Sequence, residues 1–209
     1  MNEMMNPGGM LIVFSAPSGS GKTTLLFEIL KNHPEFQFSV SVTTRAPRSD
    51  EQNGVNYHFL SEEEFEALIR NDELLEWNEV YGNKYGTLKR TVKEVLQKGK
   101  SIILDTDTVG AFNIRKHFPD AVLVFIIPPS PVVLYERLKN RHTESHEAME
   151  KRLKAVPKEI ARMTEYDYIV INDDFVRALS QVNAIIEAEK LRSSRVFPVL
   201  CEWRNYCDG

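Results

Sequence analysis

The chain has 209 residues and a mass of 24.0 kDa, with 42% hydrophobic and 27% charged residues. At about 150 residues per domain this length suits one large domain or two small ones, and the composition excludes a disordered chain and a collagen-like repeat. Because 26 lysines and arginines stand against 30 aspartates and glutamates, the net charge is −4, which excludes the overall basic character typical of nucleic-acid-binding proteins.

Neither a membrane span nor a secretion signal is expected. The longest apolar run, residues 121–127, is far shorter than the roughly 20 residues that a membrane-spanning helix needs. The run at 10–14 is too short for the hydrophobic part of a signal peptide, and no basic segment precedes it. Cys201 and Cys207 fit neither a disulfide framework nor a zinc-binding spacing, so we interpret them as reduced thiols. We therefore expect a cytoplasmic protein that binds neither membrane nor nucleic acid.

Short apolar runs rich in β-branched residues predict strands, at residues 10–14, 101–104, 121–127 and 168–171. Because these runs are apolar on both faces, they favour a parallel sheet covered by helices. Helical patterns separate them, at residues 23–32, 92–98, 131–141 and 146–164. We expect Pro157 to kink the last helix, because proline removes a backbone donor. Alternating strands and helices indicate an α/β fold.

The segment between residues 38 and 85 interrupts this alternation. Its apolar and polar residues alternate around Val40 and Val42 and again toward Tyr57, which predicts a small antiparallel insertion. Ser61 and the following glutamates form a capping box that predicts a helix up to Ile69. Farther along, Ser130 before a proline predicts the start of the helix at residue 131.

Residues 16–23, Ala-Pro-Ser-Gly-Ser-Gly-Lys-Thr, match a phosphate-binding loop except that alanine stands at the first glycine position. The loop follows a predicted strand and opens a predicted helix, as the motif requires. Gly19 and Gly21 let backbone N–H groups surround phosphate oxygens at a helix N-terminus. Lys22 is expected to reach the β- and γ-phosphates, and the Thr23 hydroxyl to bind Mg²⁺. At Ala16 we expect ordinary backbone angles, because alanine tolerates positive φ poorly.

Asp105 follows the predicted strand at 101–104, which places a carboxylate at the carboxyl edge of the sheet, where α/β proteins bind ligands. We expect it to contribute to the Mg²⁺ site, directly or through water. Asp107 either shares this role or is an ordinary turn aspartate.

A second and longer signature is Ser-Val-Ser-Val-Thr-Thr-Arg-Ala-Pro-Arg at residues 39–48, followed by Gly54 and Tyr57. It resembles the nucleoside-monophosphate site of guanylate kinases. Further matches to the family are Glu76, Arg137 and residues 83–87, 104–107, 127–130, 141–143, 151–153 and 166–173. The resemblance spans roughly residues 10–190.

The resemblance implies phosphoryl transfer from ATP to GMP or dGMP, with Mg²⁺ as cofactor. The fold it implies is a three-layer α/β P-loop core with a parallel sheet, a GMP-binding insertion and a helical lid. We expect a single domain, with the core at about 9–39, 98–128 and 164–192, the insertion at about 40–97 and the lid at about 129–163.

The same resemblance implies four sets of site residues. The ATP-binding set is Ala16, Pro17, Ser18, Gly19, Ser20, Gly21, Lys22, Thr23, Thr24 and Asn172, the last of these toward adenine. The GMP-binding set is Ser41, Arg45, Arg48, Tyr57, Glu76, Tyr85, Thr87 and Asp105. The catalytic set is Lys22, Arg45, Arg137, Arg141 and Arg152, and the Mg²⁺ ligands are Thr23 and Asp105.

The residue types suit these roles. The Arg45 and Arg48 guanidinium groups can grip a phosphate in bidentate pairs. The Glu76 carboxylate can accept from both N1–H and the 2-amino group of guanine, a donor pair that adenine lacks. Sites built to hydrogen-bond a group reject analogues lacking it by about 10⁴ to 10⁵. Arg137 and Arg141 are four residues apart and share a helix face, which favours an anion between them, although a basic solvent-facing surface is the alternative.

Two other functions stay open. An inactive guanylate-kinase-like domain would use the GMP pocket to bind protein, although such domains typically lose the phosphate-binding loop. A kinase of another phosphorylated acceptor, such as a ribose bisphosphate, would not need Glu76, Ser41 and Thr87 as base readers. Three positions depart from the family's usual glycine, glutamine and glycine: Asp50, Val109 and His142.

Overall fold

Five parallel strands form the central sheet, in the order β2-β7-β1-β8-β9. Their bounds are β1 Leu11–Ser15, β2 Phe36–Phe38, β7 Ser101–Asp105, β8 Val122–Ile127 and β9 Tyr168–Ile171. The computed structural model describes residues 9–49, 51–80, 82–139, 146–196, 200 and 206. The four predicted strands and the α/β class are confirmed. The edge strand β2 was missed, because Phe-Gln-Phe is too short to form an apolar run.

Alternate residues of the strands point to opposite faces of the sheet, and each face is buried under helices. One face, with Ile12 and Phe14, packs against α1 (Lys22–Asn32) and α7 (Phe175–Lys190). The other face, with Leu11 and Val13, packs against α3 (Lys89–Gln97) and α4 (Thr108–His117). Burial on both faces explains why these strands are apolar throughout.

The insertion contains a second sheet, ordered β4-β3-β6-β5. Its strands are β3 Val42–Thr43, β4 His58–Phe59, β5 Leu74–Val80 and β6 Asn83–Leu88. The pairs β3–β6 and β5–β6 are antiparallel as predicted, but β3–β4 is parallel, so the sheet is mixed. The predicted capping box is present at the start of α2 (Glu62–Arg70), whose Phe65 packs against this sheet.

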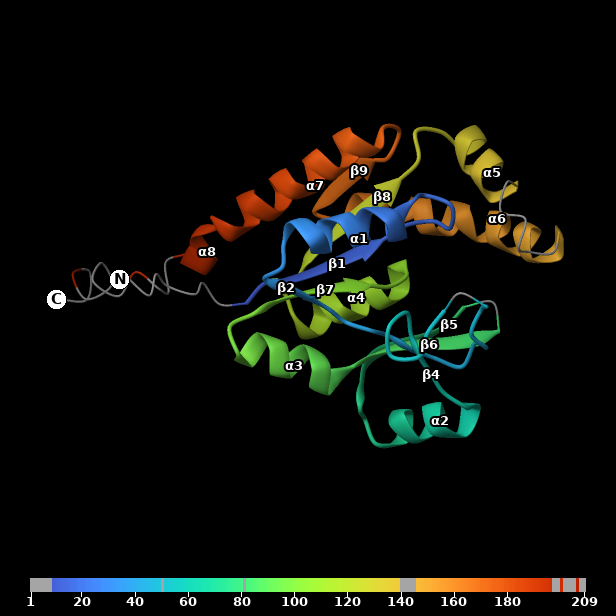
Figure 1. Ribbon diagram of the computed structural model, residues 1–209, viewed down its shortest axis with the longest axis horizontal. Helices are drawn as coiled ribbons and strands as arrows, with labels where there is room; N and C mark the ends of the chain where they lie inside the picture. Colours follow the sequence, from blue (N-terminus) through green and yellow to red (C-terminus); the bar gives the residue numbers. More distant parts are fainter. Residues whose placement is uncertain are drawn as a thin grey trace.

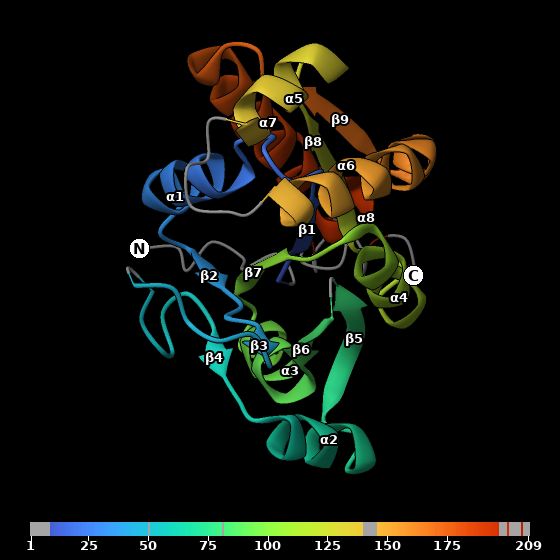
Figure 2. The ribbon, with the colours of Figure 1, turned by 90° about the vertical axis from the view of Figure 1, so that its right-hand side faces the viewer.

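Two further helices follow β8. They are α5 (Pro131–Lys139) and α6 (His146–Ala161), and the 3₁₀ turn η1 (Met163–Glu165) comes next. Ser130 caps α5 by accepting from the Val133 amide, as predicted, and Pro157 lies inside α6. Figure 1 shows α5 and α6 at the upper right and β5 and β6 at the lower right, with α1 and β1 between them. Figure 2 keeps this order in a view turned by 90°.

The chain leaving α6 is attached to α4. The Arg162 guanidinium lies 3.8 Å from the centre of the Phe112 ring, within the range of a cation–π contact. Tyr166 packs edge-on against the same ring, with 5.2 Å between ring centres. The middle of α4 therefore supports the segment that returns from α6 to the central sheet.

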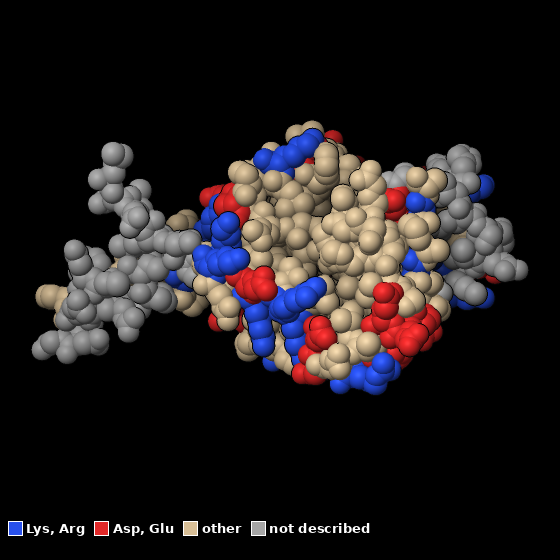
Figure 3. Space-filling view, turned by 60° about the horizontal axis from the view of Figure 1, so that its bottom comes forward, with Lys and Arg blue, Asp and Glu red and all other residues tan. Residues whose placement is uncertain are grey.

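Charged side chains of both signs are interspersed on the face shown in Figure 3. Ion pairs join charges of opposite sign in the insertion, where Lys84 binds Glu62 and Glu66 of α2, and Lys89 binds Asp72. Among the described helices, none is both long and apolar enough to cross a bilayer.

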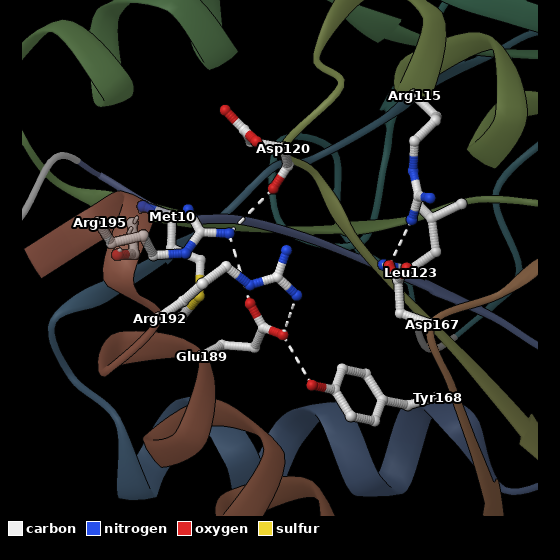
Figure 4. Close-up of polar contacts among 10 residues, drawn as sticks. Met10, Arg115, Asp120, Leu123, Asp167, Tyr168, Glu189, Arg192 and Arg195 are labelled. Carbon is white, nitrogen blue, oxygen red and sulfur yellow. Dashed lines mark hydrogen bonds and ion pairs between the residues drawn. The ribbon is translucent and has the colours of Figure 1, made fainter.

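The end of α7 is held by a buried carboxylate, Glu189, which is only 2% exposed (Figure 4). The Tyr168 hydroxyl donates to it at 2.7 Å, and Arg192 and Arg195 form ion pairs with it. Arg195 also donates to the carbonyl of Asp120 at 2.9 Å. One acidic side chain thus joins α7, the short helix α8 (Ser193–Val196), β9 and the loop before β8.

We predict that Glu189→Ala lowers the free energy of unfolding by about 3 kcal/mol, because it leaves the largely buried Arg195 guanidinium, 10% exposed, without its carboxylate partner. The matched control is Glu187→Ala, which removes a carboxylate that is 61% exposed and pairs with Lys190 on the same helix. That control should cost less than about 1 kcal/mol. Urea denaturation of both variants measures the difference, and equal losses would contradict the role of the cluster.

Candidate active site

The loop between β1 and α1 has the backbone geometry of a phosphate-binding loop. Gly19 and Gly21 adopt left-handed φ angles of 90° and 84°, which only glycine adopts readily. The φ angle of Ala16 is not positive, as predicted. Ser20 closes the loop by donating its amide to the Pro17 carbonyl at 3.2 Å. The first amides of α1 lack acceptors within the helix, and a helix start of this kind is suited to an anion.

Lys22 and Asp105 form an ion pair at the carboxyl edge of the sheet. Asp105 is the last residue of β7 and lies beside Phe14 of β1 in the strand register, so the sheet itself brings the carboxylate to the loop. Thr23 is exposed in the first turn of α1. A hydroxyl and a carboxylate are hard oxygen donors, which fit Mg²⁺, an ion that takes few protein ligands and keeps most of its waters.

Residues on three other elements hold the loop from outside. The Asn172 side chain, 6% exposed after β9, donates to the Ser20 carbonyl at 2.7 Å. A Cβ at Gly21 would lie 2.4 Å from this amide nitrogen, so glycine is needed there for space as well as for its φ angle. Arg137 of α5 donates to the Asn172 carbonyl at 3.0 Å, and Arg152 of α6 donates to the Ser18 hydroxyl.

Two of the three expected lid arginines therefore reach the loop. The third, Arg141, lies outside the described residues, as do Asp50 and His142. Val109 is described and lies on α4 with 42% of its surface exposed.

The arginines of the insertion are organised by an acidic residue that sequence analysis missed. Glu51 accepts from the Arg45 guanidinium at 2.8 Å and, through its other oxygen, from the backbone amide of Arg48 at 2.8 Å. The hydrogen bond with Glu51 raises the pKa of Arg45. In the sequence, the only indication of this role was that a glutamate, Glu51, stands three residues after Arg48.

Aromatic rings lie beside this arginine. The Arg45 guanidinium lies 5.4 Å from the centre of the Tyr57 ring, and Tyr57 and Tyr85 meet at 5.9 Å between ring centres. Burial raises the pKa of the Tyr57 hydroxyl, and the negative charge of Asp105 raises it further. Tyr57 of the insertion and Asp105 of the core thus lie close enough to interact.

Glu76 is a buried carboxylate on β5, 7% exposed. The hydroxyl of Thr87, its partner in the β5–β6 register, donates to Oε1 at 2.6 Å. Burial raises the pKa of Glu76 to about 7; the Thr87 hydrogen bond opposes this shift, and the nearby Asp107 charge adds to it. Ser41 directly precedes β3, where its carbonyl accepts from the His58 amide. Asp107, left open by the sequence, is the N-cap of α4, and its side chain accepts from the Gly110 amide.

Glu159 of α6 is a further acidic residue that the sequence did not single out. Burial raises its pKa to about 7, while the positive charges of Lys22 and Arg152 oppose this shift. The helix α6 therefore brings both a basic and an acidic side chain toward the phosphate-binding loop.

The fold and this loop define a P-loop nucleotide-binding protein whose parallel core carries an inserted second sheet. A family model described as guanylate kinase matches residues 8–189, which is most of the chain. The chain belongs to the guanylate kinase family.

Individual relatives agree with this assignment. The guanylate kinase of Carboxydothermus hydrogenoformans is 46% identical over 195 residues, which cover 93% of this chain and 96% of the relative. That of Symbiobacterium thermophilum is 48% identical over 196 residues, with coverages of 94% and 93%. The crystal structure of guanylate kinase from Anaplasma phagocytophilum is similar with a TM-score of 0.74 and 34% identity, covering 90% of each chain.

The raised pKa of Glu76 predicts a pH-dependent contribution to stability. The folded chain keeps this proton up to about pH 7, whereas the unfolded chain loses it near the ordinary value of 4.5. Between these values the folded state binds more protons, so the contribution of Glu76 to the free energy of unfolding falls as the pH rises and is level above pH 7.

Relative to the wild type, Glu76→Gln should therefore become more stable between about pH 5 and pH 8, because it carries no proton to lose. Urea denaturation at both pH values measures this change, with Glu79→Gln, at an exposed position of the same strand, as the control. A constant difference between wild type and Glu76→Gln would refute the assignment.

Proposed function

We propose that the chain transfers the γ-phosphoryl group of ATP to GMP or dGMP, giving ADP and GDP or dGDP. The observation that carries this proposal is the buried Glu76 carboxylate, held by Thr87 on the sheet of the insertion, together with the Lys22–Asp105 ion pair at the phosphate-binding loop. Membership of the guanylate kinase family supports the same activity.

Guanine is recognised by its hydrogen-bond donors. Ionised Glu76 accepts from N1–H and the 2-amino group, and Ser41 and Thr87 complete the base edge. Adenine offers no such donor pair and leaves the buried carboxylate with Thr87 but without donors from the base, which is why the site rejects adenine.

The acceptor phosphate is held by the insertion. Arg45 and Arg48 bind its oxygens through their guanidinium groups, and the hydroxyls of Tyr57 and Tyr85 add further donors. Glu51 orients Arg45 for this role, which supports the placement of the phosphate beside the aromatic pair.

ATP binds at residues 16–24, with its phosphates on the loop amides and Lys22 at the β- and γ-phosphates. Asn172 belongs to this site as the residue that holds Ser20, since its side-chain amide donates to that carbonyl. Thr23 and Asp105 would hold Mg²⁺, which, when bound, supplies positive charge to the transferring phosphoryl group.

Catalysis consists of positioning and charge stabilisation. The attacking oxygen belongs to a phosphate whose second pKa, about 6, leaves it mostly ionised at pH 7, so no general base is required. Lys22, Arg45, Arg137, Arg141 and Arg152 hold the two anions in line and balance the charge that develops between them. Closure of the insertion (about 40–97) and the lid (about 129–163) toward the core excludes water and prevents hydrolysis.

The test is a coupled assay of ADP release with Mg·ATP, comparing GMP, dGMP, AMP, UMP and ribose 1,5-bisphosphate as acceptors. Turnover with GMP and dGMP alone is the expected result. Turnover with the sugar phosphate alone would indicate a kinase of another acceptor. Retained GMP binding without turnover would indicate a binding module.

We predict that Lys22→Ala lowers kcat by at least about 10²-fold, because it removes a preorganised positive charge from the transferring phosphoryl group. GMP binding, measured calorimetrically without ATP, should change little. Lys31→Ala is the matched control, since Lys31 lies at the exposed end of the same helix and pairs only locally with Glu28. A variant that kept its kcat would remove Lys22 from the catalytic set.

A further inference from the structure

Gly110, in the first turn of α4, leaves space that the Glu76 carboxylate occupies. A Cβ built on Gly110 would lie 2.5 Å from Glu76 Oε2 and 2.2 Å from Thr106 Oγ1, both far shorter than a normal contact. Gly110 is not one of the glycines with positive φ, so its backbone conformation is open to any residue. An alanine at this position would therefore force the Glu76 and Thr106 side chains to shift.

Alanine at position 110 would make the helix itself more stable than glycine does. Glycine inside a helix costs about 0.5–1 kcal/mol relative to alanine, because it loses more backbone entropy on folding. The benefit of Gly110 must lie outside the helix, and the atoms that an alanine would meet belong to Glu76 and Thr106.

The other carboxylate oxygen of Glu76 is fixed from the opposite side. Oε1 accepts from Thr87 on β6 at 2.6 Å, while Oε2 faces Gly110. The side chain is 7% exposed, which leaves little room for another rotamer. Displacing Oε2 would therefore disturb the carboxylate as a whole.

A second contact joins the same two elements. Asn78 lies two residues beyond Glu76 on β5 and faces the same side of the sheet. Its side-chain amide donates to Asp107 Oδ2 at 2.9 Å, while Asp107 Oδ1 accepts from the Gly110 amide at 2.8 Å. The N-cap of α4 is thus hydrogen-bonded to its own helix and to β5 at once.

We propose that the first turn of α4 positions the Glu76 carboxylate for guanine, with Gly110 leaving the space for it and Asn78 tying β5 to the Asp107 cap. This inference rests on the proposed function and deepens it. Gly110 and Asn78 are positioning residues, because they act on the base through Glu76.

The first test is Gly110→Ala. Because it displaces the base-reading carboxylate, KM for GMP should rise by about tenfold or more, while KM for ATP stays within about twofold. The preference for GMP over IMP, whose base lacks the 2-amino group, should narrow. Val109→Ala is the matched control, since it changes the neighbouring exposed residue of the same helix turn and should alter neither KM.

Rescue separates positioning from a general structural effect. Glu76→Asp shortens the side chain by one methylene group and removes the overlap between this carboxylate and a Cβ at position 110, while the overlap with the Thr106 hydroxyl remains. In the Gly110→Ala background it should therefore cost much less than it does alone, since coupled residues give non-additive effects. Simple additivity of the two losses would argue against the proposal.

Asn78→Ala provides an independent variant, because it removes the tether without adding an atom. Asn78→Ala should raise KM for GMP and leave KM for ATP unchanged. If Gly110→Ala does not fold, the test of the proposal is the KM of Asn78→Ala for GMP together with its directly measured GMP affinity. Folded variants with unaltered GMP kinetics would overturn the inference while leaving the proposed function intact. A wild type that transfers no phosphoryl group to GMP would instead overturn the proposed function.

Discussion

The parallel sheet, buried on both faces, is the constraint on which the site depends. Because all five strands run in one direction, their carboxyl ends lie at the same edge of the sheet. The loops that connect these ends to the following helices therefore lie close together at that edge. Asp105 at the end of β7, the phosphate-binding loop after β1 and Asn172 after β9 come together for this reason. The apolar strand residues have no functional groups of their own, but by forming the sheet they determine where the polar side chains of the site lie.

Acidic side chains are distributed through this site along with the basic ones that a phosphate requires. Asp105 pairs with Lys22, and Glu51 pairs with Arg45. These partners neutralise and orient the cations, which costs less than holding several unpaired positive charges together. Glu76 differs from them, because Thr87 is its hydrogen-bond partner and the charge near it, Asp107, has the same sign. The environment of the Glu76 carboxylate therefore suits a ligand that supplies hydrogen-bond donors.

Features encoded in adjacent residues could be predicted from the sequence. The phosphate-binding loop, the capping box at Ser61 and the apolar strands each depend on local spacing, and the structure contains all of them. The helices α4 and α7 were missed for different reasons. In α4, Gly110 and β-branched residues weaken the helical pattern, whereas α7 buries Ala178, Val182 and Ile186 at regular spacing, a signal that was present but not used. The roles of Asn78 and Glu159 arise from contacts between distant segments, which no local pattern reports.

The helix α4 is in contact with both parts of the chain that flank the site. Its first turn meets β5 of the insertion through Gly110 and Asp107, and Phe112, within the next turn, supports Arg162 at the exit from α6. A short α-helix behaves as a rigid rod, since its backbone hydrogen bonds resist bending. A shift of the insertion that moved α4 would therefore also move the Phe112 ring against which Arg162 packs. The insertion and the segment that follows α6 are therefore mechanically coupled through α4.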